Sequence, residues 1–400
     1  MPCLCARGLQ LLLHKISRYH YTSFSFVNLP EYFKVNRIET PDAYSERLLT
    51  MDFVDLRSDT VTLPTQEMLD AIKHAKLGDD VFCEDPTVNQ LQEMAAERMG
   101  KEAALLVATG TQANLVSLMC NARRGELAIL ESESHIYWYE AGGISAVAGL
   151  LPWPLKSSSG ALDPEVVEAA IRSKNIHFPN PTLLCVENTH NRHGGTIIKP
   201  DQLKALSEIA RAHEMRFYMD GARIFNAVVA LKTDVKQFTK HVDNLMFCLS
   251  KGLSCPVGSL LVGTVEFIEK ARKTRKLLGG GMRQAGIIAA SGVIALEKMV
   301  DRLEEDHVNA MCLAEGLAKV DGLSIDLERV QTNIVLFDIS KLGLADDQFL
   351  SRLREKEVLA LAQGKNKVRL VTHRGIEKEH VEKVIAAVAA TANEAHLKRK

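Results

Sequence analysis

The sequence predicts an α/β protein in which a large, mostly parallel sheet is followed by a small C-terminal αβ domain. Between residues 104 and 262, short apolar runs typical of buried strands alternate with segments of helical period. Such alternation is typical of a parallel sheet with helices on both faces. A glycine run at residues 279–281 and a long helical stretch then separate this part from a second αβ region.

The predicted elements follow one another in a regular order. Strands are expected at residues 104–107, 127–130, 182–186, 216–219, 244–249 and 259–262, and helices at residues 87–99, 164–173 and 200–213. A long helical stretch is expected over residues 284–319, followed by small-domain strands at residues 333–337 and 367–371. We therefore expect a leader over residues 1–50, a large domain over residues 51–300 and a small domain over residues 301–400.

The composition fits a globular enzyme and argues against several other classes of protein. The 400 residues are 46% hydrophobic and 25% charged with a formal net charge of -1, so we expect no nucleic-acid partner. No apolar stretch reaches the roughly 18 residues that a membrane span requires. The eight cysteines include no Cys-x-x-Cys motif, so we expect neither a disulfide framework nor a bound metal.

The first 50 residues differ in composition from the rest of the chain. Residues 1–30 contain no acidic residue, while Arg7, Lys15 and Arg18 lie around a short apolar run. An acid-free, basic N-terminus is typical of a mitochondrial transit peptide. The alternative is an N-terminal extension without a targeting role, on a cytosolic protein.

A lysine and an aspartate at the ends of two predicted strands point to a carbonyl cofactor. Lys251 follows the apolar run 244–249, where an amine partly withdrawn from water is able to form a Schiff base. Asp220 ends an earlier apolar run, 31 residues before Lys251 (251 − 220), which allows both residues to lie at one edge of the sheet. Pyridoxal 5'-phosphate needs an amine for its aldehyde and an anion for its ring nitrogen. The alternatives are a solvated loop lysine and a helix-capping aspartate.

A phosphate site is predicted where the strand 104–107 runs into the segment ATGTQAN, residues 108–114. Gly110 and Thr111 would begin a helix there, and the free N–H groups at a helix N-terminus bind phosphate. The alternative is an ordinary capped turn. The sequence contains neither Gly-x-Gly-x-x-Gly nor a Walker loop, which argues against a dinucleotide oxidoreductase and a nucleotide hydrolase.

Several longer motifs, occurring in order, resemble those of the L-threonine aldolases. They are VDLRSDTVT (54–62), GDDVFCEDP (78–86), ENTHN (187–191), DGAR (220–223), LSKG (249–252) and LGGGMRQ (278–284). The resemblance implies the aspartate-aminotransferase-like fold (fold type I), with pyridoxal phosphate bound to Lys251. It also implies a homotetramer built from dimers, and cleavage of the amino acid threonine or allo-threonine to glycine and acetaldehyde.

The resemblance further implies roles for single residues. Ser58, Arg223 and Arg369 would hold the substrate carboxylate, for which the planar fork of arginine is well suited, and Arg223 would also contact the cofactor. His135 would stack on the cofactor ring, or take the hydroxyl proton directly or through a water molecule. Glu140 would orient the imidazole or hold that water.

Two basic residues beside the glycine run are implied to act across a subunit interface. Lys276 and Arg283 match residues that reach the neighbouring subunit's phosphate, although a solvated basic helix face is an alternative for Lys276. Phe82 and Cys83 stand where many relatives carry Tyr and Gly, which leaves the side-chain preference open. Another pyridoxal phosphate lyase acting on β-hydroxy amino acids and a non-catalytic relative remain alternatives; the latter predicts loss of the cofactor lysine, which is present.

Overall fold

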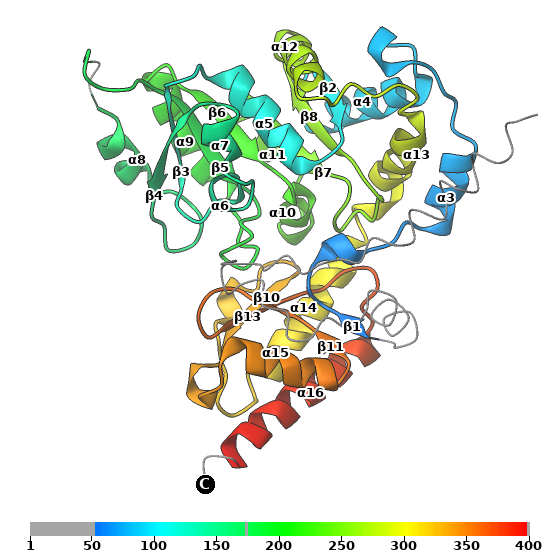
Figure 1. Cartoon of the computed structure of the whole chain (residues 1–400), viewed down its shortest axis with the longest axis vertical. Coiled ribbons are helices and arrows are strands. Elements are labelled where there is room, and N and C mark those ends of the chain that lie inside the picture. Colours follow the sequence, from blue (N-terminus) through cyan, green and yellow to red (C-terminus); the bar gives the residue numbers. More distant parts are fainter. Residues whose placement is uncertain (1–52, 173–174, 398–400) are drawn as a thin grey trace, which may run out of the picture. The chain divides into compact units, whose positions relative to one another are not determined.

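The computed structural model describes residues 53–172 and 175–397 of the chain. A seven-stranded sheet forms the centre of a large domain (Figure 1). In pairing order its strands are β2 (Ala103–Val107), β8 (Ser259–Gly263), β7 (Asn244–Cys248), β6 (Arg216–Asp220), β5 (Pro181–Glu187), β3 (Leu127–Glu131) and β4 (Leu151–Leu155). The pairings from β7 to β4 are parallel, and β8 runs antiparallel to both of its neighbours. The predicted mostly parallel sheet is confirmed.

Strand β4 is the one strand of this sheet that the sequence pattern does not predict. Its sequence is LPWPL, and Pro152 and Pro154 lack the N–H groups that a central strand needs. The strand lies at the edge of the sheet, where it pairs only with β3, and prolines are tolerated at such an edge.

Alternate residues of the strands face two separate apolar cores, one on each side of the sheet. On β6, Phe217 and Met219 belong to the larger core, while the fully buried Tyr218 belongs to the second one. This period of two with apolar residues on both faces requires helices on both sides of the sheet. The large-domain helices are α3 (Gln66–Lys73), α4 (Pro86–Met99), α5 (Gly110–Asn121), α6 (His135–Trp138), α7 (Gly143–Ala146), α8 (Pro164–Ala170), α9 (Pro200–Ala212), α10 (Ile224–Ala230), α11 (Lys236–Thr239), α12 (Val265–Leu277) and α13 (Gly286–Ile294).

The helical stretch expected over residues 284–319 is present but interrupted. Helix α13 passes into a π-helical turn, Ala295–Met299, and α14 (Leu303–Leu317) begins after a break. The carbonyl of Leu296 accepts a hydrogen bond from Arg98 Nη1 at 2.5 Å, so a group from outside the helix competes for this part of the backbone. Apolar periodicity alone does not reveal such a competitor.

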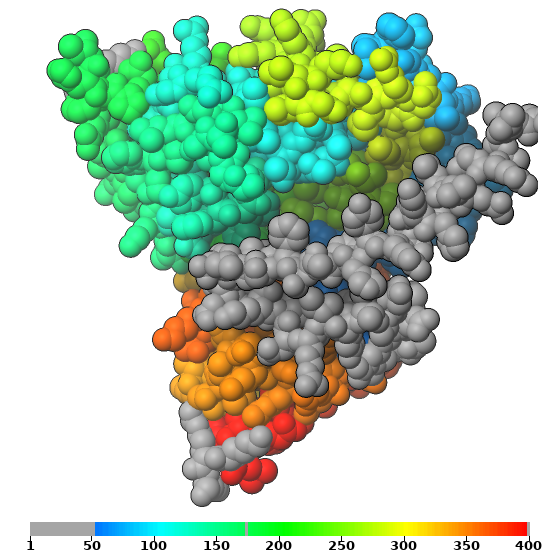
Figure 2. Space-filling model, in the orientation of Figure 1, coloured from blue at the N-terminus to red at the C-terminus, as the bar shows by residue number. Residues whose placement is uncertain are grey.

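The C-terminal domain has its own sheet and core. Its elements are α14, β9 (Ser324–Ile325), β10 (Ile334–Asp338), α15 (Asp346–Glu355), β12 (Leu361–Ala362), β13 (Lys367–Val371) and α16 (Lys378–Leu397). The sheet order is β12-β13-β10-β9, and all of its pairings are antiparallel. In the space-filling view the orange and red residues of this domain gather apart from the cyan and green residues of the large domain (Figure 2).

The first described strand belongs to the C-terminal domain although it precedes the large domain in the chain. Strand β1 (Val54–Asp55) pairs in parallel with β11 (Val358–Leu359), and Val54 and Leu56 are part of the C-terminal core. The segment that follows, with Ser58, therefore passes from the small domain toward the large one. Within residues 53–172 and 175–397, no helix combines the length and apolarity needed to cross a membrane.

Candidate active site

A cavity of about 280 Å³ brings most of the predicted site residues together. It lies at the carboxyl ends of β6 and β7, where ligands bind in open α/β sheets. Six predicted residues are among those that line it: Gly110, Thr111, His135, Glu140, Asp220 and Lys251. Lys251 follows β7 by three residues, and Asp220 is the last residue of β6. The strand-end spacing therefore places these two residues on one rim, as the sequence predicts.

A buried amide joins the two carboxylates of this cavity. Asn114 Nδ2 donates hydrogen bonds to Asp220 Oδ2 at 2.9 Å and to Glu140 Oε1 at 2.6 Å. Its Oδ1 accepts a hydrogen bond from the Tyr218 hydroxyl at 2.6 Å, which fixes the orientation of the amide. Asp220, only 2% exposed, also accepts from the backbone N–H of Ala222. Neutral donors thus hold the side chain of Asp220 in one position.

His135 is positioned by two glutamates. Its Nδ1 lies 2.9 Å from Glu140 Oε1, and its backbone N–H donates to Glu187 Oε2 at 2.6 Å. Burial lowers the pKa of His135, but its hydrogen bond to Glu140 and the charges of Asp220 and Glu187 raise the pKa above its ordinary value overall. The imidazole therefore keeps its proton to a higher pH than a free histidine.

The pKa of Glu140 is also raised. Burial is the largest cause, and the negative charge of Asp220 acts in the same direction, while hydrogen bonds from His135 and Asn114 oppose the shift. The Glu140 side chain is 1% exposed, and its second oxygen, Oε2, is buried without a hydrogen-bond partner among the described residues. The pair of His135 and Glu140 is therefore a proton-holding unit at the wall of the cavity.

Helix α5 supplies the predicted anion-binding end of the cavity. It begins at Gly110, and the side chain of its N-cap residue, Thr109, accepts a hydrogen bond from Gln112 N at 3.0 Å. A Cβ at Gly110 would lie 2.9 Å from Cys248 Sγ and 3.1 Å from Met246 Cε, so glycine lets the helix start against the end of β7. The free N–H groups of the first turn and the helix dipole together favour a phosphate there.

Arg223 is engaged within the protein rather than lining the cavity. Its Nε and Nη2 donate to Asp59 Oδ2 and Oδ1 at 2.7 and 2.6 Å, and Asp59 is fully buried. Although burial raises the pKa of Asp59, the charge and hydrogen bonds of Arg223 bring it well below its ordinary value. Nη1 is the one guanidinium nitrogen of Arg223 that makes no hydrogen bond within the described residues. Arg223 therefore cannot offer two free nitrogens to the substrate carboxylate, as the prediction requires. Its role toward cofactor and substrate stays a prediction.

Arg369 lies in the same charged cluster, on strand β13. Nη1 donates to Asn191 Oδ1 at 2.7 Å and Nη2 to the Arg57 carbonyl at 2.8 Å, while the buried Nε has no partner among the described residues. Burial and then the positive charge of Arg223 lower the pKa of Arg369 to about 10. Because the charge of Arg223 disfavours the cationic form of Arg369, an added negative charge beside Arg369 would be favourable. Ser58 directly precedes Asp59, and its Oγ accepts a hydrogen bond from the backbone N–H of Thr60.

Lys276 and Arg283 are not brought into the cavity of their own chain. Both are exposed, and Arg283 Nη1 lies 3.0 Å from Asp79 Oδ2. Lys276 lines a separate cavity of about 370 Å³ together with Arg272 and Lys273. Their predicted action across a subunit interface stays a prediction.

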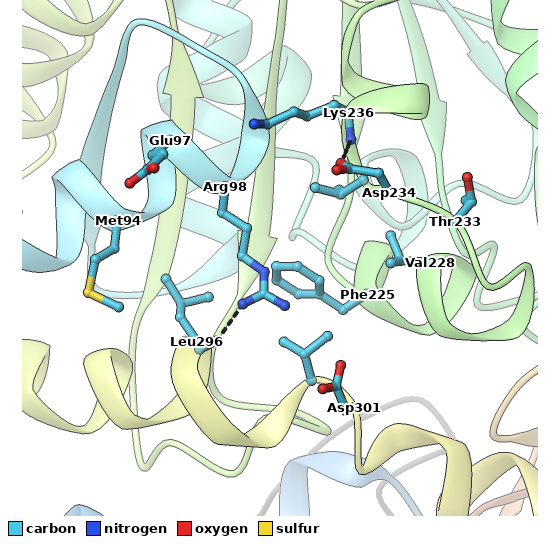
Figure 3. A pocket seen from close by; sticks show the side chains of 12 residues that line it. Met94, Glu97, Arg98, Phe225, Val228, Thr233, Asp234, Lys236, Leu296 and Asp301 are labelled. Atoms are coloured by element: carbon cyan, nitrogen blue, oxygen red, sulfur yellow. Dashed lines mark hydrogen bonds between the residues drawn. The ribbon is translucent and has the colours of Figure 1, made fainter.

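The largest of the described cavities, about 520 Å³, lies elsewhere and has different chemistry (Figure 3). Arg98 crosses it, with its guanidinium 5.2 Å from the centre of the Phe225 ring. Charged residues of both signs line the cavity, among them Lys236 and Asp301, and none of the predicted site residues does. We therefore place the candidate active site at the smaller cavity.

The sequence does not reveal the residues that hold the predicted ones in place. Asn114 stands in the segment predicted to bind phosphate, and the only signal for it is an amide on the buried face of a helix. Asp59 and Glu187 stand in quoted motifs, but their partners Arg223 and His135 are 164 and 52 residues away in the chain. No local pattern predicts contacts over such separations.

Comparison with known proteins identifies the family. Residues 55–341 match the family model described as beta-eliminating lyase. The low specificity L-threonine aldolase of Escherichia coli (strain K12) is 43% identical over 334 residues, which cover 83% of this chain and 97% of that protein. Low-specificity L-threonine aldolase 1 of Arabidopsis thaliana is 41% identical, with 83% and 94% covered. A solved structure of Leishmania major threonine aldolase has a TM-score of 0.73 at 18% identity, covering 84% of this chain and 99% of that one, and supports the fold. The chain therefore belongs to the beta-eliminating lyase family, in which it groups with the low-specificity L-threonine aldolases.

Proposed function

We propose that this protein is a threonine aldolase that cleaves L-threonine and L-allo-threonine to glycine and acetaldehyde with pyridoxal phosphate as its cofactor. The observation that carries the proposal is the cavity in which Lys251, Asp220 and the N-terminus of α5 meet the pair of His135 and Glu140. The names and activities of the relatives support the same reaction.

The donor set of the cavity fits pyridoxal phosphate. Lys251 would hold the aldehyde carbon, Asp220 the ring nitrogen, and the backbone N–H groups at Gly110 and Thr111 the phosphate. The hydrogen bonds from Asn114 and Ala222 hold the carboxyl group of Asp220 in place, as an interaction with the ring nitrogen requires. When bound, the cofactor supplies an electron sink for a bond broken at the substrate α-carbon.

The cluster of charged residues beside the cavity would orient the substrate. Arg369 retains unpaired N–H groups, Arg223 retains Nη1, and the Ser58 hydroxyl lies at the start of the same segment as Asp59. A carboxylate held by these groups cannot rotate freely. The residues then fix which α-carbon bond faces the electron sink, and this alignment selects cleavage of the carbon–carbon bond.

His135 would move the proton of the substrate hydroxyl. In its neutral form the imidazole accepts that proton, directly or through a water molecule, while Glu140 stabilises the resulting positive charge across 2.9 Å. The backbone contact with Glu187 holds the ring segment in place. We therefore propose His135 as the base and Glu140 as the residue that positions it.

The assembly and the leader form two further parts of the proposal. We propose a homotetramer built from dimers, in which the exposed Lys276 and Arg283 act on the partner's phosphate site. Leu277, 75% exposed beside Lys276, fits an apolar contact at such an interface. The leader lies outside the described residues; its composition supports mitochondrial import. Light scattering of the holoenzyme tests the first, and the mass of the mature N-terminus tests the second.

A product assay tests the reaction. The holoenzyme is incubated separately with L-threonine, L-allo-threonine and L-serine, and acetaldehyde, glycine, pyruvate and ammonia are quantified. We expect acetaldehyde and glycine in equal amounts from both threonines. Pyruvate and ammonia without acetaldehyde would instead identify a β-eliminating enzyme and refute the proposal.

A further inference from the structure

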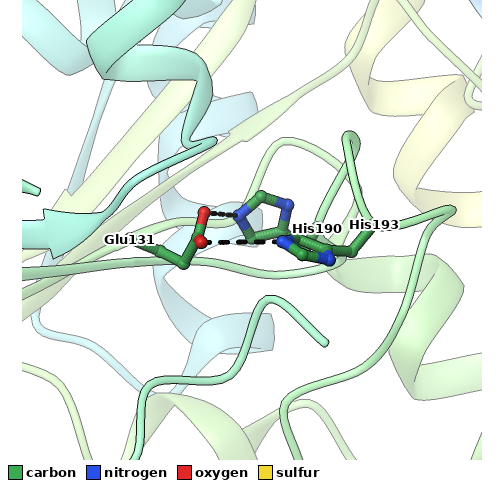
Figure 4. A group of neighbouring side chains, drawn as sticks. All are labelled: Glu131, His190 and His193. Carbon is green, nitrogen blue, oxygen red and sulfur yellow. Dashed lines mark ion pairs between the residues drawn. The ribbon is translucent and has the colours of Figure 1, made fainter. Parts of the chain in front are cut away.

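A second cluster of titratable side chains lies at the carboxyl ends of β3 and β5 (Figure 4). Glu131 is the last residue of β3, and His190 and His193 come from the loop that follows β5. His190 Nε2 lies 3.0 Å from Glu131 Oε2, and His193 Nε2 lies 3.5 Å from Glu131 Oε1. One ligand atom from each residue lies within 4.8 Å of the others.

The histidines of this cluster are buried but lack hydrogen bonds. The side chains of Glu131, His190 and His193 are 1%, 0% and 14% exposed. Both ring nitrogens of His190 and Nε2 of His193 are buried without a hydrogen-bond partner among the described residues, and their contacts with Glu131 are ion-pair contacts. A fully buried imidazole normally has a partner for each nitrogen. These ring nitrogens are therefore available to bind a further group.

The carboxylate of the cluster is fixed by other donors. The hydroxyls of Ser132 and Ser157 donate to Glu131 Oε1 at 3.2 and 3.1 Å, and the backbone N–H of Glu133 donates to Oε2 at 2.6 Å. These bonds orient Glu131 without any help from the histidines. Fixed outer contacts of this kind are typical of carboxylates that bind metal ions.

The loop that carries the histidines is closed and tightly packed. The backbone N–H of Gly195 donates to the His190 carbonyl, and His190 N–H donates to the Thr196 carbonyl, both at 2.9 Å. Gly160 crosses the ring of His190, where a Cβ would lie 2.6 Å from Cγ. Gly160 therefore leaves room for the imidazole of His190, whose Nε2 lies beside Glu131.

We propose that Glu131, His190 and His193 bind a divalent transition-metal ion, with zinc as the best match. Two imidazole nitrogens and one carboxylate oxygen are a common zinc ligand set. Zinc ligands lie at about 2.0–2.2 Å from the ion, so two ligands of one tetrahedral ion lie roughly 3.3–3.5 Å apart. Glu131 Oε2 lies 3.0 Å from His190 Nε2 and Oε1 lies 3.5 Å from His193 Nε2, so one carboxylate offers an oxygen to each imidazole near this spacing.

The bound ion would brace the loop that supports the active site. Glu187 precedes His190 by three residues and holds the backbone N–H of His135, and Asn191 accepts from Arg369. Zinc would thus tie the end of β3 to the segment that positions both residues. The role is one of positioning, and it does not add a reactive group to the cavity.

Metal titration of the full-length holoenzyme tests this site. The protein is stripped with a chelator and titrated with Co²⁺, whose visible absorption reports coordination, and then with Zn²⁺ in competition. We expect one ion per chain, displaced by zinc. His193→Ala is the main variant because His193 is the most exposed ligand, and we expect it to weaken the affinity by roughly 100-fold or more.

A second histidine–glutamate pair gives a matched control. His213 Nε2 lies 2.8 Å from Glu168 Oε1 on the surface, outside the cluster, so His213→Ala should bind cobalt as the wild type does. Glu131→Gln is the second test variant, and circular dichroism checks that each variant is folded. The proposal is overturned if the wild type binds neither ion with a Kd below about 1 μM, or if folded His193→Ala binds as tightly as the wild type.

Discussion

Glu140→Gln should shift the pH dependence of the reaction by about one unit. In the wild type the Glu140 carboxylate lies 2.9 Å from His135 Nδ1 and raises the pKa of the imidazole. As the pH rises through this raised pKa, His135 loses its proton and becomes able to accept the substrate's. The variant keeps the shape of the side chain but removes the charge, so the pKa of His135 falls and the base form appears at a lower pH.

The size of the shift follows from the strength of the contact. A hydrogen bond to a charged group contributes about 1.5–3 kcal/mol. The His135 side chain is 34% exposed, so solvent screening favours the lower limit of this range. About 1.5 kcal/mol corresponds to roughly one pKa unit. The charges of Asp220 and Glu187 remain in the variant and continue to raise the pKa, so a much larger shift is not expected.

The assay is the pH profile of kcat/KM for acetaldehyde release from L-threonine. We expect the acidic limb of the profile to move to lower pH by about one unit in Glu140→Gln. Glu133→Gln is the matched control, because Glu133 pairs with Arg192 at 3.1 Å instead of with His135. An unchanged acidic limb in Glu140→Gln, or an equal shift in the control, would refute the assignment of His135 as the titrating base.

Three further substitutions test the cofactor lysine and the charged cluster. Lys251→Ala should lose the visible absorption of the lysine-bound cofactor together with the activity, as measured by spectroscopy and acetaldehyde release. Asp59→Asn should lower the free energy of unfolding by about 3 kcal/mol, measured in denaturant, because it leaves the buried Arg223 unpaired. This loss should be full above the ordinary carboxyl pKa and shrink as the pH falls, because the folded-state pKa of Asp59 is depressed and the wild type loses its charge there. Arg369→Lys should raise the KM for threonine roughly tenfold with a smaller change in kcat, because lysine lacks the planar fork.

Surface residues of the same type provide the controls for these variants. Lys273→Ala should keep the visible band, Asp321→Asn should leave the free energy of unfolding within about 0.5 kcal/mol of the wild type, and Arg329→Lys should leave KM unchanged. A Lys251→Ala protein with wild-type absorption, a fully stable Asp59→Asn or an unchanged KM in Arg369→Lys would contradict the corresponding role.

The sequence predicts those parts of the molecule that depend on local patterns. Apolar runs identify six of the seven strands of the large sheet, and the spacing of Asp220 and Lys251 correctly places both on one rim. Strand β4 is not predicted, because prolines are unfavourable in strands. Its position at the edge of the sheet permits them. The break before α14 is not predicted, because the hydrogen bond from Arg98 to the Leu296 carbonyl does not alter the apolar periodicity of the sequence.

Long-range electrostatic pairing is the part that sequence patterns do not predict. The arginine of the DGAR motif suggests a free anion-binding group, yet two nitrogens of Arg223 donate hydrogen bonds to Asp59. Asn114 gives no sign in the sequence that it joins Asp220 and Glu140. The cluster of Glu131, His190 and His193 is invisible for the same reason, because a zinc site without a short Cys or His repeat has no local signature.

The pairing of β1 with β11 has a consequence for the order in which the protein folds. Val54 and its partner Val358 are separated by almost the whole described chain, so β1 cannot pair until nearly all of the polypeptide has left the ribosome. Lys251 and Asp220 need no residue beyond the large domain to reach their places in the sheet. The cofactor end of the cavity can therefore form during synthesis before β1 pairs with β11. The proposed substrate end, to which we assign Ser58 and Arg369 from opposite ends of the described chain, is completed last.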